Sequence, residues 1–180
     1  MELIRGFKHF RPEHRGCVAT IGAFDGVHLG HQAVLRQLIA KGKEMGLPST
    51  VVLFEPLPRE FFSPNDAPAR LMSFHEKFHA LRDLGIDRVL RIRFTPGFRD
   101  MTAMAFIHKL FVEGLGVKYI VVGDDLRFGR NRSGDFDLLR KVGKRDGFDV
   151  VDTATLQFSG ERVSSTRIRE VLAEADFALA

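Results

Sequence analysis

Residues 18–32 read V-A-T-I-G-A-F-D-G-V-H-L-G-H-Q, and the rest of the chain is organised around this stretch. Its first four residues, Val18–Ile21, predict a buried strand, and two glycines then mark a turn. A helix should follow at once, because the apolar residues between Val34 and Ile39 recur at the three-to-four spacing of one buried face. Gly46-Leu-Pro48 predicts where that helix ends.

Two histidines, His28 and His31, fall at the predicted helix N-terminus with Gly30 between them. This position carries unpaired backbone N–H groups and the positive end of the helix dipole, which together favour a phosphate. A glycine lets the ligand approach the backbone closely, and imidazoles add hydrogen-bond donors aimed at the same anion. The stretch predicts a phosphate site, although a helix start with two solvent-facing histidines would have the same sequence.

Length and composition are those of an ordinary folded domain. The chain has 180 residues, of which 44% are hydrophobic and 28% charged, so we expect one domain over residues 1–180. No apolar run approaches the ~20 residues of a membrane span, and the N-terminus lacks the apolar core of a signal peptide. A single cysteine, Cys17, cannot form an internal disulfide. We therefore expect a cytoplasmic protein with no membrane partner.

The charge balance is mildly positive, since 27 basic and 23 acidic residues give a net charge of +4. The basic residues are scattered rather than gathered in one run, and no ladder of aromatic residues accompanies them. An anionic small-molecule substrate suits this charge as well as a nucleic acid does. Charge alone does not decide between these two classes of ligand.

Strands and helices are expected to alternate along the rest of the chain. Apolar runs predict strands over residues 49–54, 87–94, 119–122, 148–152 and 154–158. Helical spacing predicts helices over residues 74–84, 102–113 and 135–145, and another that begins near residue 164 and continues through residue 172. The last residues, 174–180, also have the composition of a helix interior. This order predicts an α/β fold with a doubly wound parallel sheet.

A second informative segment, F-E-P-L-P-R-E-F-F over residues 54–62, follows the second predicted core strand. Two prolines two residues apart predict an extended loop at the carboxyl end of this strand, where open α/β sheets bind ligands. Phe54 and Phe62 could flank a flat aromatic ring, although phenylalanines near strand ends are often plain core residues. A rigid surface loop is the alternative.

Two later segments repeat this arrangement. Residues 119–129, Y-I-V-V-G-D-D-L-R-F-G, place polar residues and glycines directly after a short buried strand. Residues 163–169, V-S-S-T-R-I-R, place hydroxyl groups and two guanidinium groups at a helix start, where they could hold phosphates. The alternative for residues 119–129 is an acidic turn without a ligand, and the alternative for residues 163–169 is an ordinary helix cap.

Together these four segments resemble the FMN adenylyltransferase module of bacterial bifunctional riboflavin kinase/FAD synthetases, a branch of the nucleotidylyltransferase superfamily. The matching motifs are G-A-F-D-G-V-H-L-G-H, F-E-P-x-P, V-V-G-x-D and S-S-T-x-I-R, which occur in the family's order and cover nearly the full length. Leu57 stands where many members carry histidine, and Leu126 replaces the usual aromatic residue. The resemblance implies a Rossmann-like nucleotidylyltransferase fold.

The resemblance also implies a reaction. AMP is transferred from ATP to FMN by direct in-line attack of the FMN phosphate, giving FAD and pyrophosphate, with Mg²⁺ accompanying ATP. The implied catalytic residues are His28, His31 and Arg169. The implied ATP-binding residues are these three together with Gly22, Phe24, Gly26, Asp125, Ser164, Ser165 and Thr166. The implied flavin-binding residues are Phe54, Pro56, Pro58, Phe62, Arg127 and Phe128. No metal ligands are assigned.

Two alternatives stay open. The first is a related nucleotidylyltransferase that uses another phosphorylated acceptor, and the second is a flavin or nucleotide-binding module without catalysis. The four motifs favour ATP and FMN as partners and speak against a nucleic acid. In the bifunctional family a riboflavin kinase domain comes next; it is missing from this chain, so we expect no kinase activity.

Overall fold

The computed structural model describes residues 1–123, 125–153, 157–158 and 161–175. Six strands form one sheet in the order β1-β4-β3-β2-β5-β6, and every neighbouring pair is parallel. The strands are β1 (Glu2–Ile4), β2 (Val18–Ile21), β3 (Ser49–Glu55), β4 (Arg88–Arg93), β5 (Tyr119–Val122) and β6 (Asp149–Asp152). The doubly wound parallel sheet predicted from the sequence is confirmed. No helix in the described residues is long and apolar enough to cross a membrane.

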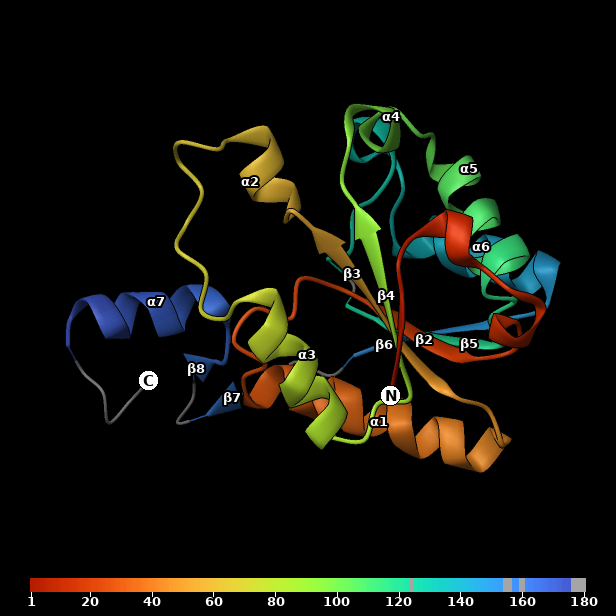
Figure 1. The fold of residues 1–180 in the computed structure, drawn as a ribbon, viewed down its shortest axis with the longest axis horizontal. Helices are drawn as coiled ribbons and strands as arrows, with labels where there is room; N and C mark the ends of the chain where they lie inside the picture. The colour runs from red at the N-terminus through yellow and green to blue at the C-terminus, as the bar shows by residue number, and fades with distance from the viewer. Residues whose placement is uncertain (124, 154–156, 159–160, 176–180) are drawn as a thin grey trace.

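Helices cover both faces of this sheet (Figure 1). On one face lie α1 (Leu29–Met45) and α3 (Phe74–Asp83). On the other lie α5 (Ala103–Ile107), its π-helical continuation η3 (His108–Gly114), and α6 (Phe136–Asp146). The remaining helices are α2 (Pro58–Phe62), α4 (Pro96–Arg99) and α7 (Ser165–Ala173), with short 3-10 turns at Phe7–His9, Pro12–His14 and Arg130–Arg132.

The alternation of side chains along each strand explains why the predicted strands read as continuous apolar runs. In β3, Val52 packs with the α5 and α6 side, whereas Val51 and Leu53 pack with the α1 and α3 side. In β5, Ile120 and Val121 divide between the two faces in the same way. A strand that is buried on both faces needs apolar residues at consecutive positions, because successive side chains point in opposite directions.

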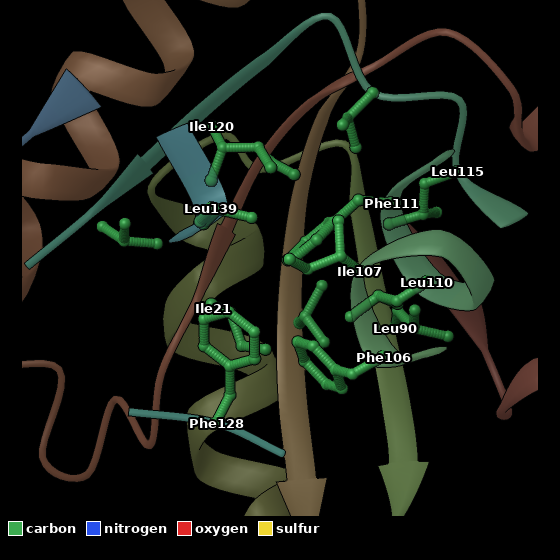
Figure 2. Packing of buried hydrophobic residues seen from close by; sticks show 14 of the residues in the cluster. Ile21, Leu90, Phe106, Ile107, Leu110, Phe111, Leu115, Ile120, Phe128 and Leu139 are labelled. Atoms are coloured by element: carbon green, nitrogen blue, oxygen red, sulfur yellow. The ribbon is translucent and has the colours of Figure 1, made fainter. Parts of the chain in front are cut away.

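The larger apolar layer lies between the sheet and the α5–η3 segment. Figure 2 shows Ile107, Leu110 and Phe111 facing Leu90 and Ile120. Phe111 is fully buried, and its ring contacts that of Phe106 edge-on at 5.8 Å. The helix predicted over residues 102–113 is therefore present, although its second half takes the wider π-helical form.

Three predictions need correction. Residues 58–62 form α2 instead of continuing an extended loop, because Pro58 occupies the first helical position, where its fixed φ suits a helix start. Of the strand predicted over residues 154–158, only residues 157–158 are described, and they do not join the sheet. Residues 154–156 lie outside the described residues, and β7 (Gln157–Phe158) pairs antiparallel with β8 (Glu161–Arg162). Finally, α7 ends at Ala173 and Ala175 has a φ of +58°, so the helix does not continue through residue 175.

Gly42, near the end of α1, allows this helix to approach the start of β2 and the segment before β3 closely. A Cβ at Gly42 would lie 2.8 Å from the Leu47 carbonyl oxygen and 3.2 Å from Cγ2 of Val18. Since a backbone carbonyl cannot swing away, we predict that Gly42→Ala lowers the free energy of unfolding by about 1–3 kcal/mol. Urea denaturation measures the change.

Gly97→Ala is the matched control, because Gly97 also lies in a helix and a Cβ there meets nothing within 4 Å. It should leave stability unchanged or raise it slightly. Equal effects of the two substitutions would contradict the proposed close approach of α1.

Candidate functional site

Two adjoining cavities lie where the parallel strands end. The first, the histidine cavity, has a volume of about 540 Å³. Its walls come from the segments that follow β2, β3, β5 and β6 and from the start of α7, namely residues 22–25, 57–60, 122–123, 125, 153, 163–166 and 169, with His28 and His31 of α1. The topology brings these segments together because the carboxyl ends of parallel strands meet at one edge of the sheet.

The second, the aromatic cavity, has a volume of about 680 Å³. Its apolar wall consists of phenylalanines from β3, α2, the end of β4, α4, α5 and the segment after β5: Phe54, Phe62, Phe94, Phe98, Phe106 and Phe128. The rings of Phe54 and Phe98 lie 5.4 Å apart, and those of Phe106 and Phe128 lie 5.1 Å apart. Such a wall suits a large flat ring system, which would stack on or against aromatic faces.

His28 caps the start of α1 with its own side chain. Its Nδ1 accepts a hydrogen bond from the backbone N–H of His31 at 3.3 Å. A neutral imidazole that accepts at one nitrogen carries its proton on the other, so Nε2 of His28 is a donor. The two histidine rings stack with their centroids 3.6 Å apart, and the Phe24 ring lies 5.0 Å from that of His31. His31 is therefore held between two other rings.

Burial keeps both imidazoles neutral near pH 7. It lowers the pKa of His31 to about 3, and the neighbouring His28 and Lys77 act in the same direction. Burial also lowers the pKa of His28, against the attraction of Asp25. The histidines are consequently hydrogen-bonding groups without charge near pH 7.

A comparison within the chain separates His31 from an ordinary buried histidine. His14 is 1% exposed, and both its ring nitrogens have partners: Nδ1 accepts from the Arg11 backbone N–H at 3.1 Å, and Nε2 lies 3.0 Å from Glu2 Oε1. Nδ1 of His31 is buried too, yet among the described residues it has no hydrogen-bond partner. Leaving a buried polar group unpaired costs about 1–3 kcal/mol, so this arrangement favours a role in ligand binding over one in the core.

The starts of α1 and α7 converge on the histidine cavity. A Cβ at Gly30 would lie 3.3 Å from the Val163 carbonyl oxygen, so glycine allows the two segments to meet. Ser164 caps α7 by accepting from the Arg167 backbone N–H at 3.2 Å. The Ser165 hydroxyl donates to the Asp25 carbonyl oxygen at 2.9 Å. Two helix N-termini aimed at one cavity give two sets of backbone donors for phosphate groups.

Asp25 ties these segments together, and sequence reasoning assigned it no role. It is 2% exposed, and its carboxylate accepts from the backbone N–H groups of Leu71 and Met72, each at 3.1 Å. It also pairs with the Arg169 guanidinium. Arg169 Nε donates to the Ala69 carbonyl oxygen at 2.6 Å, and a further N–H donates to the Ser165 carbonyl oxygen at 3.2 Å.

These contacts qualify the prediction for Arg169. A guanidinium has five N–H donors, and three of the five in Arg169 are engaged by Asp25, Ala69 and Ser165. The side chain lines the histidine cavity with its position fixed. It therefore anchors α7 whether or not its remaining donors reach a ligand.

Lys77 was also missed. Although lysine is normally exposed, Lys77 is 3% exposed, and its Nζ donates to the Ala23 carbonyl oxygen at 2.6 Å. Burial lowers its pKa. A sequence signal existed, because Lys77 occupies a position of the apolar face formed by Phe74, Phe78 and Leu81.

An ion-pair network fixes α2 at the boundary between the cavities. Arg70 contacts Glu55 Oε1 at 2.5 Å and Glu60 Oε1 at 2.5 Å. Glu60 Oε2 accepts from the Leu57 backbone N–H at 2.9 Å. The hydrogen bond from Arg70 lowers the pKa of Glu60, so the carboxylate stays charged. The first turn of α2 is therefore held by the capping contact between Glu60 and Leu57 and by Arg70, which lies ten positions after Glu60.

The structure brings most of the predicted site residues together. Those predicted for ATP line the histidine cavity, except Gly26, and those predicted for the flavin line the aromatic cavity, except Pro56. Gly26 has a φ of +85° and forms the turn against Leu71. Leu57 lines the histidine cavity, whereas Leu126 packs against the core. Within the described part of the chain, no group of three or more metal-binding side chains occurs.

Known proteins resemble this chain over its whole length. A model of the FAD synthetase family matches residues 10–167. The chain is 52% identical over 180 residues to a bifunctional riboflavin kinase/FMN adenylyltransferase of Pseudomonas fluorescens. It is 48% identical over 181 residues to a protein of the same name from Escherichia coli K12. All of this chain is covered, and it spans 58% of the length of each of these relatives.

A solved structure agrees with the fold. The crystal structure of a macrolide-efflux protein from Streptococcus pneumoniae has a TM-score of 0.79 to this chain, covering 97% of it and 65% of that protein. The sequence identity is 22%, so the likeness concerns the fold alone. It agrees with the Rossmann-like α/β architecture predicted from the sequence.

The low pKa of His31 predicts a specific dependence of stability on pH. The folded-state pKa of about 3 lies below the ordinary histidine pKa of 6.5, so between these pH values the unfolded chain binds a proton that the folded chain does not. Stability should therefore fall as pH falls through this window, by about 1.4 kcal/mol per pH unit, and by about 2 kcal/mol at pH 5. His31→Gln should lose less stability than the wild type between pH 7.5 and pH 5.

Urea denaturation at the two pH values measures this difference. His75→Gln, which changes an exposed ring on α3, is the control and should behave as the wild type does. If His31→Gln and the wild type lose equal stability on acidification, the neutral buried state of His31 is wrong.

Proposed function

Because this chain belongs to the FAD synthetase family, we propose that it transfers AMP from ATP to FMN, releasing pyrophosphate and forming FAD. One observation carries the proposal. A cavity with two helix N-termini and two histidines adjoins a cavity walled by aromatic rings, and both are lined by Pro58, Arg59 and Pro68. ATP in the first and an isoalloxazine ring in the second would bring their phosphates together at this boundary.

The reaction is a single displacement at phosphorus. An oxygen of the FMN phosphate forms a bond to the α-phosphorus of ATP, the bond from that phosphorus to the α–β bridging oxygen breaks, and pyrophosphate leaves with the electron pair. A phosphate monoester has a second pKa near 6, so the attacking group is already largely dianionic at pH 7 and no base is required. Neutral histidines agree with this, since donors are needed rather than proton acceptors.

The chain contributes positioning and charge stabilisation. Nε2 of His28, His31 and the backbone N–H groups at the starts of α1 and α7 hold the ATP phosphates as negative charge moves toward the leaving group. Ser164, Ser165 and Thr166 contribute from α7. Asp125, which follows β5, contacts the nucleotide. Mg²⁺ bound with the triphosphate would neutralise part of its charge.

The flavin assignment rests on the aromatic cavity. Phe54, Phe62 and Phe128 border the ring system, with Pro58 and Arg127 at its edge. A related enzyme for another phosphorylated acceptor would share the histidine cavity but would not need this aromatic wall. A non-catalytic binding module would need neither the convergent helix starts nor the junction between the cavities.

We also propose a cytoplasmic location for this protein and small molecules as its partners.

The reaction itself is the direct test. The chain is mixed with ATP, Mg²⁺ and FMN, the flavins are separated by chromatography, and pyrophosphate is assayed. We expect FAD and pyrophosphate in equal amounts from FMN and neither from riboflavin, which lacks the attacking phosphate. Pyrophosphate release with nicotinamide mononucleotide or phosphopantetheine, without FAD from FMN, would overturn the flavin assignment and keep adenylyl transfer.

His31 gives a second prediction. Removing one donor that stabilises developing charge typically lowers turnover by about 10²- to 10³-fold, so His31→Ala should lower kcat by that factor while the fold is retained. Steady-state formation of FAD measures the effect, and circular dichroism checks the fold. His75→Ala on the exposed side of α3 should keep wild-type turnover. Normal turnover in a folded His31→Ala variant would remove His31 from the mechanism.

A further inference from the structure

Among the described residues, three line both cavities, and one of these three is charged. Pro58, Arg59 and Pro68 line both cavities, and the two prolines offer no hydrogen-bond donor there. Arg59 is exposed, so its guanidinium is accessible to a ligand from either side. We propose that Arg59 binds the phosphate of FMN and thereby makes the site select the phosphorylated flavin over riboflavin. This inference rests on the adenylyltransferase function proposed above.

Among the described residues, the Arg59 side chain has no hydrogen-bond or ion-pair partner, whereas three other arginines around the site are paired. Arg70 pairs with Glu55 and Glu60, Arg99 pairs with Asp100, and Arg169 pairs with Asp25. These pairs engage the carboxylates of Glu55, Glu60, Asp100 and Asp25, but not that of Asp66, which lines the aromatic cavity. The positive charge of Arg59 is therefore available to an anion.

The backbone that carries Arg59 is nevertheless fixed. Glu60, the next residue, is held by Arg70 and by the Leu57 backbone N–H, and Pro58 sets the first helical position of α2. The Cα of Arg59 is thereby held at the boundary, while the long side chain can adjust to the ligand. A guanidinium bonds a phosphate through two parallel N–H groups, which both orients the phosphate and discriminates against a neutral hydroxyl.

The position of the reacting atoms favours Arg59 over the other basic residues. Arg127, Arg130 and Arg132 line the aromatic cavity only. Two carboxylates, Asp66 and Asp100, also line that cavity. In the proposed reaction the FMN phosphate has to lie between the ring in the aromatic cavity and the α-phosphorus in the histidine cavity. A residue that lines both cavities can contact this phosphate while it attacks.

The test combines a change in the protein with a change in the ligand. Dissociation constants of FMN and riboflavin are measured by quenching of flavin fluorescence for the wild type, Arg59→Ala and Arg59→Lys. Hydrogen bonds to charged groups are worth enough that Arg59→Ala should weaken FMN binding about 10- to 100-fold. Riboflavin binding should change less than about twofold, and Arg59→Lys should be intermediate for FMN, because a lysine keeps the charge but loses the two-pronged contact.

Arg132→Ala is the matched control, because Arg132 lines the aromatic cavity alone. It should leave the ratio of the two dissociation constants near the wild-type value. Urea denaturation checks that each variant is folded, which is expected because Arg59 is exposed.

Two outcomes overturn the inference. Arg59→Ala could weaken FMN and riboflavin equally, or Arg132→Ala rather than Arg59→Ala could abolish the preference for FMN. Either result leaves the proposed function intact if the wild type forms FAD. If the wild type forms no FAD from FMN and ATP, the proposed function fails instead. Formation of FAD by the wild type therefore distinguishes failure of the inference about Arg59 from failure of the proposed function.

Discussion

The buried carboxylate of Asp25 is the interaction on which the site depends. It lies in the turn after β2, pairs with Arg169 of α7, and accepts from the backbone of Leu71 and Met72. Three segments far apart in sequence are thereby joined around the histidine cavity. A buried carboxylate is stable only when paired and hydrogen-bonded, and removing one partner from such a pair typically costs about 3–5 kcal/mol. The contacts that bury and pair the Asp25 carboxylate are thus the same contacts that hold the three segments around the histidine cavity.

The electrostatics of the cavity follow from this closure. Burial makes His28 and His31 neutral, so the free site does not hold several uncompensated positive charges near one another. In the proposed reaction, fixed backbone dipoles at two helix starts attract the phosphates, and these dipoles need no reorganisation when the ligand binds. In the proposed reaction this environment stabilises charge that shifts between phosphate oxygens, while the nucleophile arrives already deprotonated.

Much of the fold could be predicted because it depends on local patterns. The apolar run Val18–Ile21, the spacing of Leu35 and Leu38, and the cap at Ser73 each determine an element within a few residues of sequence. The segments of the site could be predicted because they follow those elements directly. The motifs that resemble a known family then predicted which residues would bind the nucleotide and which the flavin.

The contacts between distant segments could not be predicted in this way. Asp25 and Arg169 are separated by 144 positions, and nothing in the local sequence of either indicates its partner. Lys77 falls on the apolar face of its helix in the sequence, but nothing local indicates that its ammonium group donates to the distant Ala23 carbonyl oxygen. The role proposed for Arg59 depends on two cavities that meet at Pro58, Arg59 and Pro68, which only the folded chain shows.

In the proposed reaction the two adjoining cavities align the FMN phosphate with the α-phosphate of ATP, and no covalent bond forms between the protein and AMP. The stereochemistry at the α-phosphorus tests this claim most directly. ATP made chiral at this phosphorus by isotopic or sulfur substitution is converted with FMN, and the configuration of the FAD formed is determined. Direct in-line attack predicts inversion of configuration. Retention would show two successive displacements through an adenylylated protein and would contradict the account.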